Sequence, residues 1–261
     1  MGVEDRQCDS RGRLRVVSYN IHKGFSPANR KFTLYGIRDA VSLVEPDILF
    51  LQEVLGRHDR HASSVSSWPD ISQHDFIAAD KWPYVAYGQT ATYNHGHQGN
   101  AIVSRYPILE YENIDISTNP IECRSLLHVV IDVPGVQGPI HCVCVHLNIF
   151  QRGRELQLRR ICDRVMQAVG DRAPLIIAGD FNDWQRRASR ILVRKLGIHE
   201  VFHQRYGDYA KSYPVQYPLL QLDRVYARGL ALIDGYPLVG KPWSDLSDHV
   251  PLYAELGVDI E

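Results

Sequence analysis

The sequence has no long apolar run and few cysteines, and both absences bear on where the protein works. No window of its 261 residues approaches the roughly 18 consecutive apolar residues that cross a bilayer, and the mostly charged and polar residues 1–15 hold no signal-peptide segment. The five cysteines are odd in number, and three of them (Cys142, Cys144 and Cys162) lie in apolar segments, as reduced core thiols do. We therefore expect a cytoplasmic protein without stable membrane insertion, although action on a lipid at a membrane surface stays open.

A strong charge of one sign is also missing. The chain carries 29 Lys and Arg against 30 Asp and Glu, a net charge of −1. Such a balance gives no global attraction to nucleic acid or to an anionic membrane, so any polyanion must bind at a local patch. Several catalytic signatures are absent too: a Gly-x-Ser-x-Gly elbow, a His-Glu-x-x-His zinc helix, a phosphate-binding Gly-x4-Gly-Lys-Ser/Thr loop and a Cys-x-x-Cys pair.

What the sequence does contain is a set of apolar, strand-like runs that stop at, or just before, polar residues suited to metals and phosphates. Isolated charges inside a core cost much free energy, so we expect these polar residues to converge on one shared rim. The runs cover residues 16–20, 48–53, 142–148, 175–183 and 222–226, and Ser247, Asp248 and His249 precede a last apolar run at 251–256.

The order of predicted elements favours an α/β fold. Apolar residues at spacings of three and four predict helices through residues 34–44 and 158–169, and a shorter helix spans 188–196. Short strands separated by turn signals fill residues 84–147, which favours antiparallel pairing. Strands that are apolar throughout need cover on both faces, so we expect two packed sheets flanked by helices. We expect one domain over residues 14–261, a flexible N-terminus at 1–13, surface loops at 56–75 and 206–220, and a monomer.

Glu53 is the best single candidate for a divalent-cation ligand. Hard cations such as Mg²⁺ prefer one or two carboxylates together with waters and substrate phosphate oxygens, and Asn20 and Asp248 could complete such a shell. In the alternative interpretation, Glu53 and Asn20 only pair with backbone groups at strand ends.

Two further pairs of residues could take part in catalysis. If the strand through Asp180 continues, Asn182 lies on the same side of the sheet as Asp180. The Asp180 carboxylate could then orient or deprotonate water while the Asn182 amide donates to a phosphate oxygen. The alternative is an Asx turn with a helix N-cap, a role that suits Asp183 best. Asp223 bonded to His249 would fix the tautomer of the imidazole and stabilise its protonated form beside a phosphate.

Together these residues resemble the endonuclease/exonuclease/phosphatase superfamily, which includes DNase I-like nucleases, neutral sphingomyelinases and inositol polyphosphate 5-phosphatases. The resemblance implies a four-layer αββα sandwich of two mixed, mostly antiparallel sheets and phosphoester hydrolysis that depends on Mg²⁺, with Mn²⁺ as the alternative ion. It covers residues 14–256 and rests on Tyr19-Asn20-Ile21, Leu51-Gln52-Glu53-Val54, residues 99–108 with Asn100, His146-Leu147-Asn148, Gly179-Asp180-Phe181-Asn182, Leu222-Asp223-Arg224 and Ser247-Asp248-His249.

By motif, the resemblance places Asn20 and Glu53 at the metal, with Asp248 nearby. Asp180 and Asn182 match the pair that activates water and binds the transition state, and Asp223 and His249 match the Asp–His pair. His146 corresponds to a phosphate-facing histidine, although a lone histidine at a strand end is often structural. The remaining expected phosphate contacts are Asn100, Arg124 and Asn148.

Two departures separate the chain from the superfamily's DNA-repair members. His22 stands where some of them carry an acidic residue, and no inserted basic loop for gripping duplex DNA is recognisable. The segment from Tyr19 to Gly24 is most similar to a bacterial branch whose substrates are not established. The favoured function is a nuclease-like phosphodiesterase; the alternatives are a phospholipid or sphingolipid headgroup phosphodiesterase, a phosphomonoesterase acting on a small phosphate ester, and a non-catalytic binding module that keeps the fold.

Overall fold

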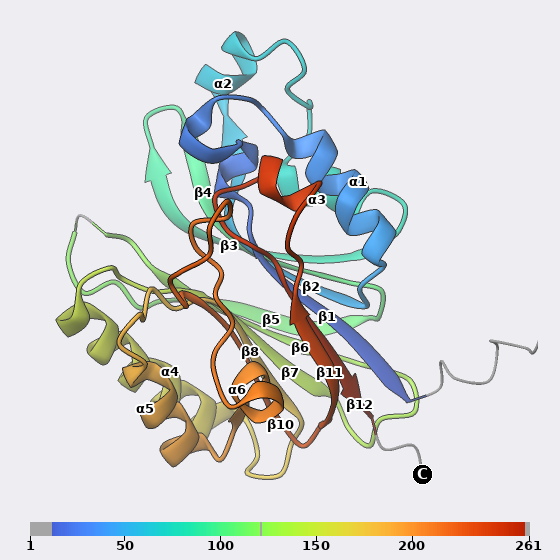
Figure 1. Ribbon diagram of the computed structural model, residues 1–261, viewed down its shortest axis with the longest axis vertical. Helices are drawn as coiled ribbons and strands as arrows, with labels where there is room; N and C mark the ends of the chain where they lie inside the picture. Colours follow the sequence, from blue (N-terminus) through green and yellow to red (C-terminus); the bar gives the residue numbers. More distant parts are fainter. Residues whose placement is uncertain (1–11, 121, 259–261) are drawn as a thin grey trace, which may run out of the picture.

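The computed structural model describes residues 12–120 and 122–258, which form two six-stranded sheets packed face to face (Figure 1). Most of the N-terminal segment expected to be flexible, residues 1–13, therefore lies outside the described residues. In spatial order, the first sheet contains β11 (Ala231–Pro237), β12 (Leu252–Gly257), β1 (Arg13–Asn20), β2 (Ile48–His58), β4 (Gly96–Ser104) and β3 (Tyr84–Tyr93). The second contains β5 (Ile108–Asp115), β6 (Ser125–Ile131), β7 (Ile140–His146), β8 (Leu175–Asp180), β10 (Asp223–Arg228) and β9 (His199–Glu200).

Helices cover the outer face of each sheet, so the predicted four-layer αββα sandwich is confirmed (Figure 1). On the first sheet lie α1 (Leu34–Val44) and α3 (Gln73–Ala78), and on the second lie α4 (Gln151–Ala168) and α5 (Arg187–Leu196). The remaining helices are α2 (Asp59–Ser64), α6 (Val201–Tyr206) and the 3₁₀ turns η1 (His22–Gly24), η2 (Pro27–Asn29) and η3 (Trp243–Asp245).

The near-continuous apolar strands follow from burial on both faces. In β2, Ile48 and Phe50 face the core between the sheets, while Leu49 and Leu51 pack beneath the helices. In β7, Cys142 and Cys144 point inward and Val143 and Val145 outward. Side chains alternate along a strand, so both faces of each sheet must be apolar here.

Strand direction brings the polar ends of several strands to one edge of the sandwich. The pairs β1–β2 and β7–β8 are parallel, so the C-terminal ends of each pair lie together, with Asn20 opposite Gln52 and His146 opposite Asp180. β10 runs antiparallel to β8, and its first residue, Asp223, lies opposite Asp180. The rim therefore contains the beginning of β10 and not its end.

The segment 56–75 differs from the predicted loop. β2 continues through Glu53 to His58, and α2 and the start of α3 follow within this segment. Helices of six residues are too short to show a clear apolar repeat, which is why the sequence indicated a loop. Across residues 12–120 and 122–258, no helix is long and apolar enough to cross a membrane.

Candidate active site

Asp180 is the point at which the two sheets meet at the rim. It ends β8, and its side chain is almost fully buried. Its Oδ2 accepts a hydrogen bond from Asn20 Nδ2 of the first sheet at 3.2 Å and lies 3.5 Å from His146 Nε2 and 3.8 Å from His249 Nε2. Burial, and next the neighbouring Asp223 carboxylate, raise the pKa of Asp180 to about 6. A carboxylate with a raised pKa that remains ionised at neutral pH is suited to accept a proton.

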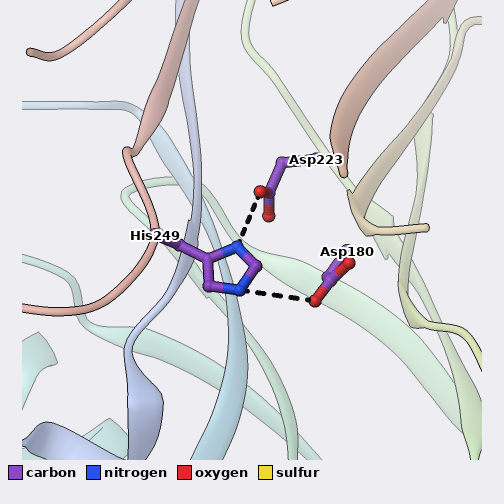
Figure 2. A group of neighbouring side chains, drawn as sticks. All are labelled: Asp180, Asp223 and His249. Carbon is purple, nitrogen blue, oxygen red and sulfur yellow. Dashed lines mark hydrogen bonds and ion pairs between the residues drawn. The ribbon is translucent and has the colours of Figure 1, made fainter. Parts of the chain in front are cut away.

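His249 lies between two carboxylates, as Figure 2 shows. Its Nδ1 is 2.8 Å from Asp223 Oδ2, and its Nε2 faces Asp180. Burial alone would lower the pKa of His249, but the carboxylates of Asp223, Asp180 and Asp248 outweigh it and raise the pKa to about 10. The imidazole is therefore protonated at neutral pH and carries a positive charge into the rim.

His146 carries no such charge. Burial, and then the positive charge of Arg124, lower the pKa of His146 well below its ordinary value. The ring is consequently a neutral imidazole whose Nε2 lies next to Asp180. His249 and His146 therefore differ in charge. Both lie near Asp180, but His249 is also bonded through Nδ1 to the buried carboxylate of Asp223.

Glu53 occupies a β-bulge in the middle of β2, and not a strand end as the sequence indicated. Its backbone is left-handed, with φ of 55°, and the pairing with β4 shifts register between Leu51 and Val54. A bulge re-aims a side chain at the cost of regular pairing. Glu53 Oε1 lies 3.5 Å from Asn20 Nδ2, and its Oε2 lies 3.6 Å from Lys23 Nζ.

The loop after β1 supplies an ammonium group and an imidazole to this acidic corner. His22, Lys23 and Gly24 all have positive φ, so this short segment folds tightly back toward the rim. His22 Nδ1 lies 3.2 Å from Asp248 Oδ1, and this contact raises the pKa of His22. Ser247 joins the same corner by donating a hydrogen bond to the backbone oxygen of Asn20 at 2.7 Å.

Asn182 does not continue the strand beyond Asp180. It has a left-handed backbone (φ of 49°), and its amide N–H donates to Asp180 Oδ1 at 2.9 Å, which is the Asx turn of the alternative interpretation. The Asn182 side chain donates one hydrogen bond to Leu147 O at 2.9 Å. Asp183 accepts from the N–H of Ala188 at the start of α5, the structural role expected for it.

The three residues predicted to contact phosphate, Arg124, Asn100 and Asn148, lie in different surroundings. Arg124 lines a small depression at the rim together with Glu53, Asn100 and His146. Asn100 is nearly buried, and its amide donates to Ser125 O at 3.3 Å. Asn148 is fully buried, and its side chain is bonded to Thr118 and Gln157, so it braces the chain after β7. Its contact with a substrate phosphate stays a prediction.

Some residues at the rim had little or no signal in the sequence. Tyr213 places its ring centroid 5.0 Å from that of His249, yet it belongs to an irregular stretch in which nothing distinguishes one aromatic residue from another.

Several arginines of α4 instead hold the fold together. Arg154 donates to the backbone after β7, Arg160 to Ser117 O, and Arg164 to Glu112.

Two groups of side chains at the rim carry atoms that could bind a cation. Asp180, Asp223 and His249 place one ligand atom each within 4.8 Å of one another. A protonated imidazole has no free lone pair, however, so this trio suits proton transfer better than ligation. Glu53, Asn20 and Asp248 offer the oxygen atoms that hard divalent cations prefer. The Lys23 ammonium already lies against Glu53, and the His22 imidazole contacts Asp248, so the second set fits a cation.

Comparison with known proteins finds a family model and a relative that match most of the chain. A model of the Endonuclease/Exonuclease/phosphatase family matches residues 17–249. A relative from Escherichia coli strain K12, the uncharacterized protein YbhP, is 43% identical over 243 residues, which cover 93% of this chain and 96% of the relative.

Solved structures share the fold at lower identity. An endonuclease/exonuclease/phosphatase from Beutenbergia cavernae superposes with a TM-score of 0.75 at 21% identity, covering 95% of this chain and 72% of that one. The D. rerio TDP2 complex with single strand DNA product superposes with a TM-score of 0.67 at 20% identity, covering 94% of this chain and 99% of that one. The family match, which spans most of the sequence, shows that the chain belongs to the endonuclease/exonuclease/phosphatase family.

Proposed function

We propose that this protein is a divalent-metal-dependent phosphodiesterase that hydrolyses a phosphoester bond by in-line attack of water, with a nucleic acid as its substrate. One observation carries the proposal: the buried Asp180 carboxylate is surrounded by Asn20, His146 and a His249 that Asp223 holds. This arrangement places a proton acceptor (Asp180), a charged imidazolium (His249) and hydrogen-bond donors around a single point at which a phosphate could bind.

Asp180 acts as the base in this scheme. It takes a proton from the attacking water, and its position is fixed by the amide N–H of Asn182 on Oδ1 and by Asn20 on Oδ2. A positioned base of this kind contributes roughly 10²- to 10⁴-fold in rate.

His249 stabilises the charge that develops on phosphorus-bound oxygen. Its protonated Nε2–H points into the rim, and Asp223 keeps the ring oriented and charged. Asn182 has a second amide hydrogen, because only one is used on Leu147 O, and neutral His146 offers a further donor or acceptor. Arg124 lies beside His146 and is the arginine of this depression that can contact a phosphate oxygen.

Glu53, Asn20 and Asp248 would hold the cation. Mg²⁺ or Mn²⁺ bound there would supply positive charge that offsets the charge of the phosphoryl group. Lys23 contacts Glu53 and His22 contacts Asp248 at the same place, so the Lys23 ammonium would lie within this corner of the rim, where a substrate phosphate could meet it.

A phosphoesterase panel tests the proposal. Purified protein is given single- and double-stranded DNA, RNA, sphingomyelin, a glycerophospholipid and inositol phosphates, with Mg²⁺ or Mn²⁺, beside the Asp180→Ala variant. We expect cleavage of a nucleic acid and a steep fall in its affinity with added salt. Hydrolysis of only the lipids, with surface dilution by detergent micelles, would replace the substrate assignment with the headgroup alternative. If the wild type cleaves no substrate of the panel, the result would favour the non-catalytic binding module.

A further inference from the structure

A groove of about 530 Å³ lies outside the proposed active site, between α5, the short strand β9, and α6 with the residues that follow it. We call it the α5–α6 groove. Its lining consists of Arg186, Ser189, Arg190, Val193, His199, Glu200, His203, Gln204 and Tyr209. Its volume falls within the range of small-molecule sites, roughly 300–1,000 Å³, so it has room for a ligand larger than a single ion.

The groove lies beside β10, the strand that begins at the rim. Glu200 of β9 pairs with Tyr226 of β10, which follows Asp223 by three residues, or roughly 10 Å of strand. At another wall of the groove, Arg186 donates its N–H to the backbone oxygen of Asp183 at 3.2 Å, in the turn that carries Asn182. The groove is therefore separate from the point at which Asp180 would position water, yet it is attached to the same backbone segments.

Most polar side chains that line the groove can donate hydrogen bonds. Arg190 is exposed, and within residues 12–120 and 122–258 its guanidinium forms no ion pair. The imidazoles of His199 and His203 and the amide of Gln204 add further N–H donors. Arg186, in contrast, is held by Asp208 at 2.9 Å and by Gln221 at 3.0 Å. Arg190 is therefore the cation of this lining that is free to pair with an anion.

Glu200 is the acidic residue of the lining, and it opposes an anion only weakly. Its side chain is almost fully buried, and its Oε2 accepts the N–H of His203 at 2.6 Å. Burial raises the pKa of Glu200 to about 7, against the positive charge of Arg224, so the carboxyl group carries only part of a negative charge at neutral pH. The exposed guanidinium of Arg190 consequently dominates the charge that a ligand meets.

The one aromatic ring of the lining is already in contact with other groups. Its centroid, that of Tyr209, lies 4.4 Å from Arg224 Cζ, 5.4 Å from Arg186 Cζ and 5.1 Å from the His203 ring centroid. The groove therefore does not select a flat ring as its ligand. Its uncommitted groups are N–H donors and a positive charge, and these select an anion with several oxygen atoms.

We propose that the α5–α6 groove is a second phosphate site, in which Arg190, His199 and His203 bind a phosphate group that is not cleaved. A guanidinium group binds two phosphate oxygens at once, and the two imidazoles can donate to the others. The phosphate could belong to another nucleotide of the nucleic-acid substrate, a use that rests on the proposed function, or to a separate phosphate compound.

Titration with inorganic phosphate tests the site without catalysis. The imidazole NMR signals of His199 and His203 are followed in EDTA at constant ionic strength, for the wild type, Arg190→Gln and Arg60→Gln. The Arg60→Gln control removes the same charge from α2, at the opposite end of the molecule (Figure 1). We expect saturable shifts in the wild type and the control, and a dissociation constant at least about tenfold higher in Arg190→Gln.

His199→Gln provides a second variant, because loss of one donor should weaken the phosphate-dependent shift of His203 even if Arg190→Gln fails to fold. Three results would overturn the proposal: no shift of either imidazole in the wild type, an equal dissociation constant in all of the proteins, or acetate acting as strongly as phosphate.

Single-stranded oligonucleotides of two lengths distinguish the two sources of the phosphate. Strands of two and eight nucleotides are bound in EDTA and followed by fluorescence anisotropy. If the substrate strand supplies the phosphate, the longer strand binds the wild type more tightly, and Arg190→Gln removes most of this gain and reduces the salt slope by about one. If length makes no difference while phosphate still shifts His199 and His203, the site belongs to a separate phosphate compound.

Turnover keeps this inference apart from the proposed function. On a substrate strand, Arg190→Gln should keep the kcat of the wild type and raise KM only where the strand is long enough to reach the groove. A fall in kcat on the two-nucleotide strand would assign Arg190 to the rim and overturn the second site. If the wild type cleaves no strand, the proposed function fails, and the phosphate titration still decides whether the groove holds an anion.

Discussion

Asp223 Oδ2 lies 2.8 Å from His249 Nδ1, and both side chains are buried at the rim where the two sheets meet. Asp223 begins β10, whereas His249 precedes β12 of the other sheet, so this contact connects the two halves of the sandwich. The carboxylate fixes which nitrogen of the ring faces Asp180 and keeps the ring charged.

Asp223→Asn should lower kcat by roughly 10³-fold or more, because an amide cannot hold the imidazole in its charged form. The side-chain volume hardly changes, so the thermal midpoint should stay close to that of the wild type. Steady-state kinetics with the best nucleic-acid substrate measures the effect. Asp171→Asn is the matched control and should behave as the wild type, because Asp171 precedes the end of β8 that lies opposite the rim. A kcat within threefold of the wild type in Asp223→Asn would contradict the assigned role.

Asp180→Asn should abolish hydrolysis and leave the protein as stable as the wild type or more so. Burial and the Asp223 carboxylate raise the pKa of Asp180, which means that ionising this carboxyl group costs more free energy in the folded protein than in the unfolded chain. An amide removes this cost and keeps an acceptor for the N–H of Asn182. Differential scanning calorimetry and single-turnover kinetics on the same preparation check both parts. A thermal midpoint that drops sharply would assign Asp180 to the stability of the fold instead.

Glu53→Gln should raise the metal concentration needed for half-maximal activity by at least about tenfold, because it removes a carboxylate ligand. Binding of Mn²⁺, followed by electron paramagnetic resonance, should weaken in parallel and gives a readout that does not need turnover. Glu45→Gln is the control, since Glu45 is exposed and pairs with Lys81. Unchanged Mn²⁺ affinity in Glu53→Gln would remove Glu53 from the proposed ligand set.

Glu200 gives a prediction about pH and stability. It accepts from the N–H of His203 at 2.6 Å at the start of α6, and burial raises its pKa from the ordinary 4.5 to about 7. A raised carboxyl pKa contributes stability below the unfolded value, and this contribution is lost as the pH rises through the folded value. Glu200→Gln should therefore unfold like the wild type near about pH 4 and be more stable near about pH 8.5, by at most about 3 kcal/mol.

Urea denaturation at both pH values measures this difference. Glu155→Gln, at a partly exposed position of α4, serves as the control. If Glu200→Gln is destabilised equally at both pH values, the hydrogen bond to His203 matters more than the charge.

Most of the fold could be predicted because its strands are buried on both faces. Runs such as 48–51 and 142–145 are apolar at every position, and this pattern survives whatever the pairing partner. The polar residues at the ends of these runs indicated the rim, because isolated charges inside such an apolar core would cost much free energy. The direction of each strand and the local backbone geometry at the rim were not predictable. Nothing local shows that β10 runs away from the rim, that Glu53 bulges out of a longer strand or that Asn182 turns back onto Asp180.

The cavity between the end of β2, the α2–α3 segment and strands β3 and β4 could not be predicted from the sequence, for a different reason. Its lining comes from β2, β3, β4 and the α2–α3 segment, which only the folded chain brings together. His58, His74 and His97 were visible as histidines in polar stretches, but their neutral state depends on burial, which no local pattern gives.

The most direct test is metal-dependent cleavage of single-stranded DNA by the wild type and by Asp180→Ala, each measured with Mg²⁺, with Mn²⁺ and with excess EDTA. The account predicts cleavage by the wild type with either ion, none with EDTA, and none by the folded variant under any condition. Cleavage by Asp180→Ala at the rate of the wild type, or cleavage by the wild type that EDTA leaves unchanged, would contradict it.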